Sequence, residues 1–355
     1  MCLPVEPVIR RIIALDPPML NKIELKNFGP LSHVSWGSLG NLNLVIGGNG
    51  CGKTFLLKAM YSALRTLEEY KRGDEQRSAS EILVEKLYWT FQAEKIGDLV
   101  SLGAGSPLSC AVTIEANEFR YSFGKETSRQ ISSLENHVSQ RSSRSIFLPA
   151  KEVLSLHQII LKTRDIDKIF GFDDTYLDLA RALQQPTTKG KNFPKFAQSR
   201  TNLEDILGGT IEFDKNSLRW VFSKGKQKFP IGVTAEGVKK IAILDTLLGN
   251  RYLDTNSVVF IDEPESALHP TAISKLLDII SALADRGIQF FLASHSYFVV
   301  KKLALIAQEK DCSIPVLSSV NGEWRSENLR DGMPDNPIID ESIRLYKEEV
   351  GLVLK

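Results

Sequence analysis

The segment that most constrains the fold of this chain is the glycine-rich loop Gly47-Gly-Asn-Gly-Cys-Gly-Lys-Thr54. It matches the pattern G-x-x-x-x-G-K-[ST], and it lies between an apolar run at 41–46 and a helical pattern from Thr54 to about Tyr70. Glycines allow backbone N–H groups to turn inward around an anion, and the helix N-terminus adds partial positive charge. The loop therefore predicts a nucleotide-binding α/β domain.

Each part of this loop has an expected role toward a nucleotide. Lys53 would reach the β- and γ-phosphates, and the hydroxyl of Thr54 would ligate Mg²⁺. Cys51 is interpreted as a small residue that fills a tight turn. The expected nucleotide-binding residues of this segment are Gly47, Gly48, Asn49, Gly50, Cys51, Gly52, Lys53, Thr54 and Phe55.

Two further candidate residues follow the apolar run 258–261, which is typical of a strand buried on both faces of a parallel sheet. Asp262 could hold Mg²⁺, and Glu263 could polarise an attacking water as a general base. His295 follows the next apolar run, 288–293, at the edge where open α/β sheets bind ligands. We expect it to hydrogen-bond a γ-phosphate.

The order of patterns predicts the fold class. Apolar runs alternate with helical patterns, which indicates an α/β protein with a mixed, mainly parallel sheet. A helical subdomain is expected over 153–207, interrupted by a polar stretch at 184–195. The segment 108–123 is expected to form strands, 127–145 a surface loop, and 210–222 a hairpin.

Composition narrows the class of protein. The 355 residues carry a formal net charge of +1, which excludes a polybasic nucleic-acid coat and an acidic disordered tail. The four cysteines form no CxxC pair, so neither a disulfide framework nor a zinc site is expected. The first residues lack the pattern of a signal peptide, and no apolar run has the length of a membrane span. We therefore expect a cytoplasmic protein without a membrane partner.

These motifs occur together in one known class. The set resembles the ABC-type ATPase heads of the SMC and RecF-like DNA-repair proteins. It is most similar to the compact ATPases of the overcoming-lysogenization-defect (OLD) group and of anti-phage systems such as PARIS and Septu. The matching segments are an opening strand at 23–30, the Walker A loop at 47–54, the Walker B run at 258–263, a D-loop-like segment at 264–270 and the switch histidine segment at 294–296.

ABC heads also carry a serine-containing signature like LSGGQ before Walker B. The best candidate in this chain is Thr234-Ala235-Glu236-Gly237, which precedes an apolar helical run at 241–248. It could offer a hydroxyl, backbone amides and a helix N-terminus to the γ-phosphate held by another subunit. Glu236 departs from the pattern, because an acid beside phosphate is repulsive.

The Q-loop glutamine of these heads contacts the nucleotide and its Mg²⁺. Gln92, at the end of Tyr88-Trp-Thr-Phe-Gln92, is the candidate. A surface glutamine in a loop is the alternative interpretation.

The resemblance implies ATP and Mg²⁺ as cofactors, ATP hydrolysis, and a homodimer or higher oligomer that sandwiches two ATP molecules. It also implies a separate effector protein, a nuclease or a toxin, that the ATPase controls in anti-phage defence. A RecF-like or SMC-like DNA-repair clamp is the alternative, and a scaffold with little turnover is a third. The expected division is an N-terminal extension at 1–20, an ATPase lobe at 21–152, the helical insertion at 153–207, a signature, Walker B and switch lobe at 208–330 and a helical tail at 331–355.

The stretch between Lys53 and Asp262 holds no heptad run, so a cohesin-like coiled-coil arm is not expected. The residues after His295 are too few for an attached nuclease domain of typical size, so we expect any nuclease or toxin chemistry in a separate protein.

Two basic clusters could contact nucleic acid. The first comprises Arg181, Lys189, Lys191, Lys195 and Arg200, with Phe193 and Phe196 between them, and the second comprises Lys224, Lys226 and Lys228. A solvated loop and a lysine-rich hairpin tip explain the same residues equally well.

Overall fold

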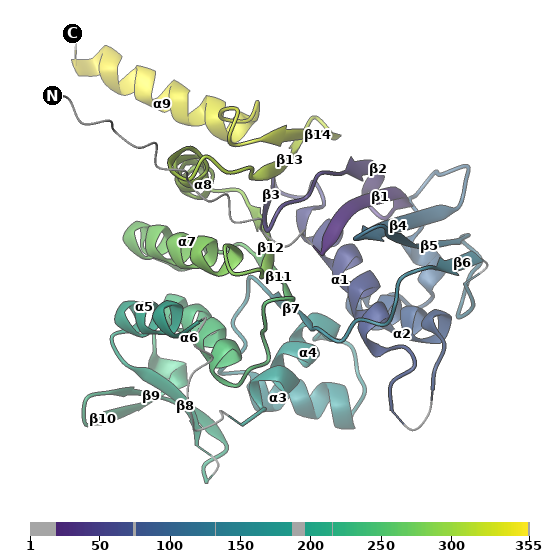
Figure 1. The fold of residues 1–355 in the computed structure, drawn as a ribbon, viewed down its shortest axis with the longest axis horizontal. Helices are drawn as coiled ribbons and strands as arrows, with labels where there is room; N and C mark the ends of the chain where they lie inside the picture. The colour runs from purple at the N-terminus through teal and green to yellow at the C-terminus, as the bar shows by residue number, and fades with distance from the viewer. Residues whose placement is uncertain (1–18, 74–75, 132, 187–195, 215, 354–355) are drawn as a thin grey trace, which may run out of the picture.

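The computed structural model describes residues 19–73, 76–131, 133–186, 196–214 and 216–353 (Figure 1). A six-stranded sheet forms the centre of the molecule, in the order β14-β13-β3-β12-β11-β7. All neighbouring pairs are parallel except β13 and β14. The strands are β3 (Leu42–Gly47), β7 (Ser145–Leu148), β11 (Val258–Asp262), β12 (Gln289–Ser294), β13 (Pro315–Val320) and β14 (Glu323–Asn328).

Strands β3, β11 and β12 are buried along their whole length, because the chain covers both faces of the sheet. Their registers pair Ile46 with Ser294, and Ala293 with Asp262. Three strands that lie far apart in the sequence therefore end at one edge of the sheet. That edge carries the glycine loop, the acidic pair after β11 and the histidine after β12.

One face of the central sheet packs on α1 (Lys53–Glu69) and α2 (Ala79–Phe91), which a second, antiparallel sheet covers in turn. Figure 1 shows α1 between the two sheets. The second sheet has the order β2-β1-β4-β5-β6. Its strands are β1 (Leu20–Phe28), β2 (Leu31–Trp36), β4 (Leu108–Ile114), β5 (Asn117–Phe123) and β6 (Ser133–Asn136).

The other face of the central sheet packs on helices from the later part of the chain. They are α4 (Asp174–Leu183), α5 (Ala197–Leu207), α6 (Glu236–Gly249), α7 (Pro270–Ala284) and α8 (Tyr297–Glu309). A small sheet of β8 (Thr210–Asp214), β9 (Arg219–Lys224) and β10 (Gln227–Pro230) lies at the end of the molecule near α3 (His157–Leu161) (Figure 1). Helix α9 (Pro337–Val353) forms the C-terminal helix, and only Ile339 of it is buried.

A buried cluster of charges joins α1, α2 and α4. The ammonium of Lys86 on α2 lies 3.1 Å from the carboxylate of Glu69, and 3.4 Å from those of Asp174 and Asp178. Asp178 also accepts from the hydroxyl of Tyr61 at 2.7 Å and from Nε of Arg65 at 3.2 Å. These partners satisfy charges that would otherwise be costly to bury.

The predicted mixed, mainly parallel α/β fold is confirmed, and one local expectation needs correction. The expected surface loop at 127–145 contains strand β6, which completes the antiparallel sheet. The expected hairpin at 210–222 is present as β8 and β9, and β10 adds a third strand beside β9. Within the expected helical insertion, 162–166 forms a turn of π-helix. Among the described residues, no helix combines the length and the apolar character needed to cross a bilayer.

Candidate active site

The glycine loop connects the end of β3 to the start of α1 through a turn that side chains would obstruct at two positions. A Cβ on Gly47 would lie 2.8 Å from Sγ of Cys51, and one on Gly52 would lie 2.8 Å from Cδ2 of Leu31. Gly52 also has a φ of 100°, which L-residues rarely adopt. A Cβ on Gly48 or Gly50 would meet no described atom within 4 Å, so these two positions face an open space.

The first turn of α1 leaves its backbone donors available. Gly52 provides no side-chain cap, and the turn contains no acid. Lys53 is buried, and its Nζ donates to the carbonyls of Gly47 at 2.9 Å and Gly48 at 3.1 Å. The ammonium and the free N–H groups therefore lie around one loop, the arrangement that binds phosphate.

Thr54 and Asp262 connect this loop to the end of β11. The hydroxyl of Thr54 donates to Oδ2 of Asp262 at 2.9 Å. Oδ1 of Asp262 is buried and has no hydrogen-bond partner among the described residues. Burial raises the pKa of Asp262, while the hydrogen bond from Thr54 opposes that shift. A hydroxyl, a carboxylate and an unsatisfied oxygen form a set of hard oxygen donors, so these residues fit a Mg²⁺ ion.

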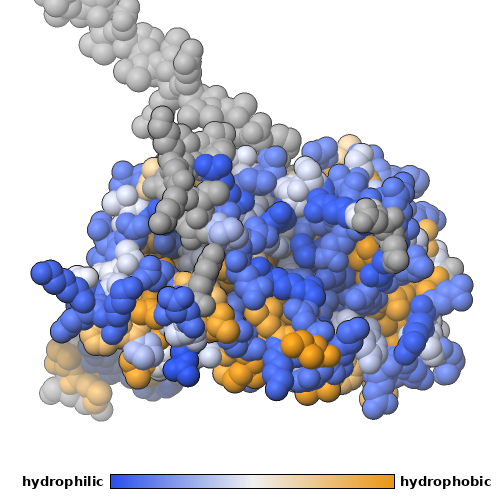
Figure 2. All heavy atoms as spheres, turned by 90° about the horizontal axis from the view of Figure 1, so that it is seen from below, coloured by the Kyte–Doolittle hydropathy of each residue, from blue (hydrophilic) through white to orange (hydrophobic). Residues whose placement is uncertain are grey.

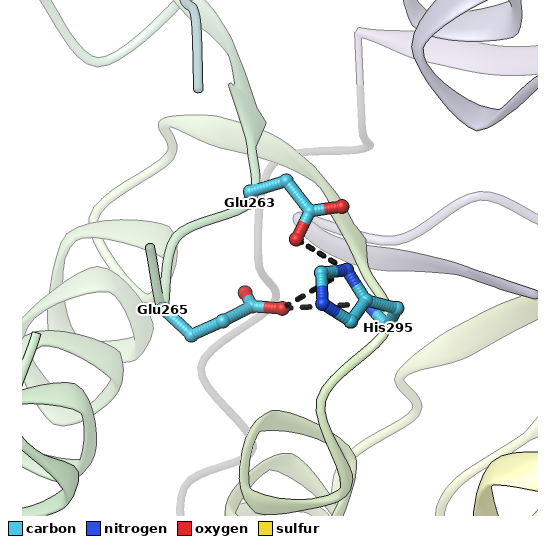
Figure 3. A group of neighbouring side chains, drawn as sticks. All are labelled: Glu263, Glu265 and His295. Carbon is cyan, nitrogen blue, oxygen red and sulfur yellow. Dashed lines mark hydrogen bonds and ion pairs between the residues drawn. The ribbon is translucent and has the colours of Figure 1, made fainter. Parts of the chain in front are cut away.

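Glu263, Glu265 and His295 meet beside this pair (Figure 3). Nδ1 of His295 lies 2.5 Å from Oε2 of Glu263 and 3.9 Å from Oε1 of Glu265. Glu263 has a φ of 51°, a conformation that is strained for a residue with a side chain. Burial raises the pKa of Glu263; His295 opposes this shift, and the charge of Glu265 reinforces it. Glu263 and His295 therefore lie in contact, and their roles as base and switch histidine stay predictions.

A pocket of about 520 Å³ opens in front of the loop and reaches Glu263. Its wall comprises Pro30, Asn49, Gly50, Gly52, Lys53, Thr54, Phe55, Lys58, Thr90, Phe91, Gln92, Asp173 and Glu263. Gln92 ends α2 in the left-handed conformation, and its Nε2 is buried without a hydrogen-bond partner among the described residues. Oγ1 of Thr90, on the same wall, is also buried without such a partner. Unsatisfied polar atoms at Thr90, Gln92 and Asp262 indicate that this region receives a polar ligand.

Comparison with known proteins identifies the family. Residues 42–301 match the model of a family described as "AAA domain, putative AbiEii toxin, Type IV TA system". The matched range contains the glycine loop, Asp262, Glu263 and His295. This chain belongs to that AAA-domain family.

One curated relative of this AAA-domain protein is an "ATP/GTP phosphatase" of Helicobacter pylori (strain ATCC 700392 / 26695). The two are 20% identical over 335 residues, which cover 82% of this chain and 90% of the relative. The match extends over most of both chains.

Solved structures establish the fold independently. An SMC head bound to the C-terminal winged-helix domain of ScpA superposes with a TM-score of 0.53 at 14% identity, over 88% of this chain and 97% of that one. An SMC head with an extended coiled coil, bound to the C-terminal domain of ScpA derived from Pyrococcus furiosus, has a TM-score of 0.48 at 12% identity, over 93% of this chain and 99% of that one. The first of these confirms the head fold predicted from the sequence.

The candidate signature of this AAA-domain protein lies at the start of α6, where Ala235 is the N-cap residue. Oγ1 of Thr234 is buried without a hydrogen-bond partner among the described residues. Glu236 pairs with the buried ammonium of Lys239 at 3.0 Å, so its charge is not left uncompensated beside the helix N-terminus. A Cβ on Gly237 would lie 2.5 Å from Cδ2 of Leu268, which shows that the helix start packs closely on the D-loop-like segment.

Phe55, predicted to bind the nucleotide, packs its ring on two other aromatic side chains. The ring centroids lie 5.5 Å from that of Phe28 and 4.5 Å from that of Phe91. The side chain thus connects the start of α1 to the antiparallel sheet and to the end of α2. It also lines the pocket, so a nucleotide contact stays a prediction.

Sequence reasoning missed several charged residues of this site. Nζ of Lys240, on α6, donates to the carbonyl of Glu263 at 2.7 Å, and burial lowers the pKa of this lysine. Nζ of Lys58 lies 2.6 Å from Oδ2 of Asp173 on the pocket wall. The segment following β11 also supplies Glu265. The acid-rich run after β11 was a local signal for Glu265, but the other pairs join distant parts of the chain.

The two basic clusters are only partly available as a binding surface. Arg181 pairs with Asp165, Arg200 with Asp245, and Lys228 with Glu212. Phe196 is buried, so it cannot stack on a base as its position in the sequence suggested. Lys224 and Lys226 are exposed near the β9–β10 turn, whereas Lys189, Lys191, Phe193 and Lys195 lie outside the described residues.

Proposed function

We propose that this protein hydrolyses ATP as a dimer and uses the cycle to control a separate effector protein in anti-phage defence. The observation that carries the proposal is the contact between Thr54 and Asp262, with Glu263 and His295 directly beside it. This arrangement supplies a phosphate loop, a metal site and a base in one place. Such a combination supports phosphoryl transfer to water better than nucleotide binding alone.

Each residue has a defined role in the proposed reaction. Lys53 and the N–H groups of the loop hold the phosphates of ATP, and His295 contacts the γ-phosphate. Thr54 and Asp262 would hold Mg²⁺, which neutralises phosphate charge when it is bound. Glu263 accepts a proton from the water that attacks the γ-phosphate in line, and ADP leaves on the opposite side.

The signature segment supports a dimer. Within the described residues, the pocket wall does not include 234–237 of the same chain. The hydroxyl of Thr234 is buried, but the start of α6 still offers helix N–H groups that no side chain caps. We infer that these groups complete the site of a second copy, so that two ATP molecules lie between two chains. ATP then favours the closed dimer, and hydrolysis releases it.

The variant Glu263→Gln tests the catalytic part of this proposal. We expect the rate of ATP hydrolysis to fall about 10²- to 10⁴-fold, since a general base contributes that much. ATP binding is retained, and mass photometry with ATP should show an accumulated dimer. Lys53→Ala is the matched control, because it should lose both ATP binding and the dimer. Unchanged hydrolysis in Glu263→Gln would show that the catalytic assignment is wrong.

One observation supports a separate protein effector. The face seen in Figure 2 carries apolar patches among hydrophilic side chains. Exposed apolar side chains of the lobe around α3 and β8–β10 are Ile159, Ile166, Ile169, Phe170, Leu218, Phe229 and Val233. Contiguous exposed apolar surface is typical of protein-binding sites.

An ATP-dependent DNA clamp is the second candidate, and the exposed Lys224 and Lys226 favour it. Reversal of both charges to Glu should weaken DNA binding and reduce its dependence on salt concentration, if this function operates. A DNA affinity that is unchanged, or absent from the start, would exclude it.

A further inference from the structure

Glu265 holds the segment that carries the switch histidine. It follows β11 by three residues, and its side chain is 10% exposed. Oε1 of Glu265 accepts hydrogen bonds from Oγ of Ser294 at 2.7 Å and from the backbone N–H of His295 at 3.3 Å. Figure 3 shows this carboxylate directed at the imidazole, on the same side as Glu263. One oxygen therefore joins the turn after β11 to the end of β12.

The contact extends one residue further along the switch segment. Oγ of Ser294, which donates to Glu265, also accepts from the backbone N–H of Ser296 at 3.0 Å. The backbone on both sides of His295 is thus fixed relative to Glu265. The imidazole is 52% exposed, so the direction in which it leaves the backbone depends on these contacts more than on packing.

The carboxylate is buried in spite of its charge. Oε2 of Glu265 is buried without a hydrogen-bond partner among the described residues. Burial lowers the pKa of Lys240, and among the nearby charges that oppose this shift, the negative charge of Glu265 has the largest effect. The same lysine donates to the backbone of Glu263. Glu265 is therefore held in place by the hydroxyl of Ser294 and the N–H of His295 at the end of β12.

We propose that Glu265 is a positioning residue for hydrolysis, which sets His295 at its distance from Glu263. This inference rests on the proposed function, in which Glu263 and His295 act on the γ-phosphate and the attacking water. Glu265 acts through the hydroxyl of Ser294 and the N–H of His295, without touching the substrate. Glu263 and His295 can act on the same reaction only if their side chains keep the correct relative geometry. A displacement of about 1 Å can lower the rate about 10²-fold.

Steady-state kinetics of three variants test this role. In Glu265→Ala we expect kcat to fall about 10- to 100-fold, with KM for ATP nearly unchanged, because the phosphate loop is intact. Glu265→Gln retains an oxygen at Oε1, so its kcat should stay within about 5-fold of the native value. Ser294→Ala should also lower kcat. Because both residues act through one contact, the double variant with Glu265→Ala should be no slower than Glu265→Ala alone.

Histidine NMR of the nucleotide-free protein supplies a readout that does not depend on turnover. We expect the His295 imidazole signal, assigned by its loss in His295→Ala, to shift in Glu265→Ala and to stay in place in Glu265→Gln. If the native protein does not hydrolyse ATP, the proposed function fails, while this signal still tests the contact.

Three results would overturn the proposal. The first is native kcat in Glu265→Ala. The second is equal loss of kcat in the Gln and Ala variants, because then the charge and not the hydrogen bonds matters. The third is a His295 signal that Glu265→Ala leaves unchanged. Circular dichroism of each variant shows whether the fold is retained, and Ser294→Ala keeps the test open if Glu265→Ala does not fold.

Discussion

The hydroxyl of Thr54 donates to Oδ2 of Asp262 at 2.9 Å, although 208 positions separate the two residues. The contact exists because β3 and β11 both border β12 and end at the same edge of the sheet. It joins the first turn of α1 to the end of a buried strand. The second oxygen of Asp262 remains without a hydrogen-bond partner among the described residues, so it is free to act as a ligand for a cation.

Removing this hydroxyl should affect the binding of the metal–nucleotide complex. In Thr54→Ala we expect ATP affinity in the presence of Mg²⁺ to fall at least 10-fold, since one oxygen donor is lost. Affinity measured in EDTA should change little. Thr54→Ser keeps the hydroxyl and should bind like the native protein. Isothermal titration calorimetry with and without Mg²⁺ measures these affinities for the native protein and both variants. Equal losses in Mg²⁺ and in EDTA for Thr54→Ala would contradict the metal role.

The rate of hydrolysis should depend on pH through Glu263. Burial raises the pKa of this carboxyl above its ordinary value of 4.5, and a base must be ionised to accept a proton. Activity should therefore be lost, as the pH falls, at a pH above 4.5. The charge of Glu265 contributes to the shift, so Glu265→Gln should move this loss to lower pH. Profiles of kcat against pH for the native protein and Glu265→Gln test this prediction. If the loss of activity in Glu265→Gln moves to higher pH, the assignment of Glu263 as the base is contradicted.

The packing of Gly237 predicts a variant that separates ATP binding from dimer formation. In Gly237→Ala the new Cβ would lie 2.5 Å from Cδ2 of Leu268 and 2.9 Å from the carbonyl of Ala267, so the start of α6 must shift. We expect native ATP affinity and loss of the ATP-induced dimer in mass photometry. Gly351→Ala, in helix α9, is the control because its Cβ would meet no described atom within 4 Å. A dimer that survives in Gly237→Ala would argue against the signature role.

The buried charges around Asp178 predict a large effect on stability. In Asp178→Asn, Lys86 and Arg65 lose a buried partner, which typically costs about 3–5 kcal/mol in the free energy of unfolding. Glu341→Gln removes an exposed pair with Arg344 and should leave the free energy of unfolding nearly unchanged. Urea unfolding compares the two. Equal, small losses would mean that solvent reaches the buried cluster.

The same residue predicts how stability depends on pH. Burial alone would raise the pKa of Asp178, but Lys86 and Arg65 prevail and hold it well below the ordinary value of 3.8. A carboxyl with a lowered pKa stabilises the fold above its unfolded pKa and loses that contribution as the pH falls. Unfolding free energies between pH 6 and about pH 3 should therefore decrease less in Asp178→Asn than in the native protein.

The sequence predicted those parts of the site that depend on local pattern. The glycine loop lies between a strand and a helix, and the acids Asp262 and Glu263 end a strand, because glycine spacing and continuous apolar runs are local signals. The α/β class was predicted, but the position of β12 between β3 and β11 came from the structure. Gln92 lines the pocket, although the sequence alone did not distinguish a nucleotide contact from a surface glutamine in a loop.

Contacts that depend on tertiary placement could not be predicted. Lys58 and Asp173 lie 115 positions apart, and no periodicity connects them. No local pattern singled out Lys240, yet its ammonium donates to the backbone carbonyl of Glu263. Strand β6 alternates weakly and is rich in polar residues, so its pairing with β5 had no signal in the sequence.

Lys86 interacts with carboxylates on two other helices, α1 and α4. Since α1 also begins with Lys53, the helix that follows the glycine loop and helix α4 of the insertion share buried charges. Sliding one past the other would separate opposite charges in an environment with little water. A protein that displaces α4 would therefore displace α1 as well, and with it the glycine loop that precedes α1.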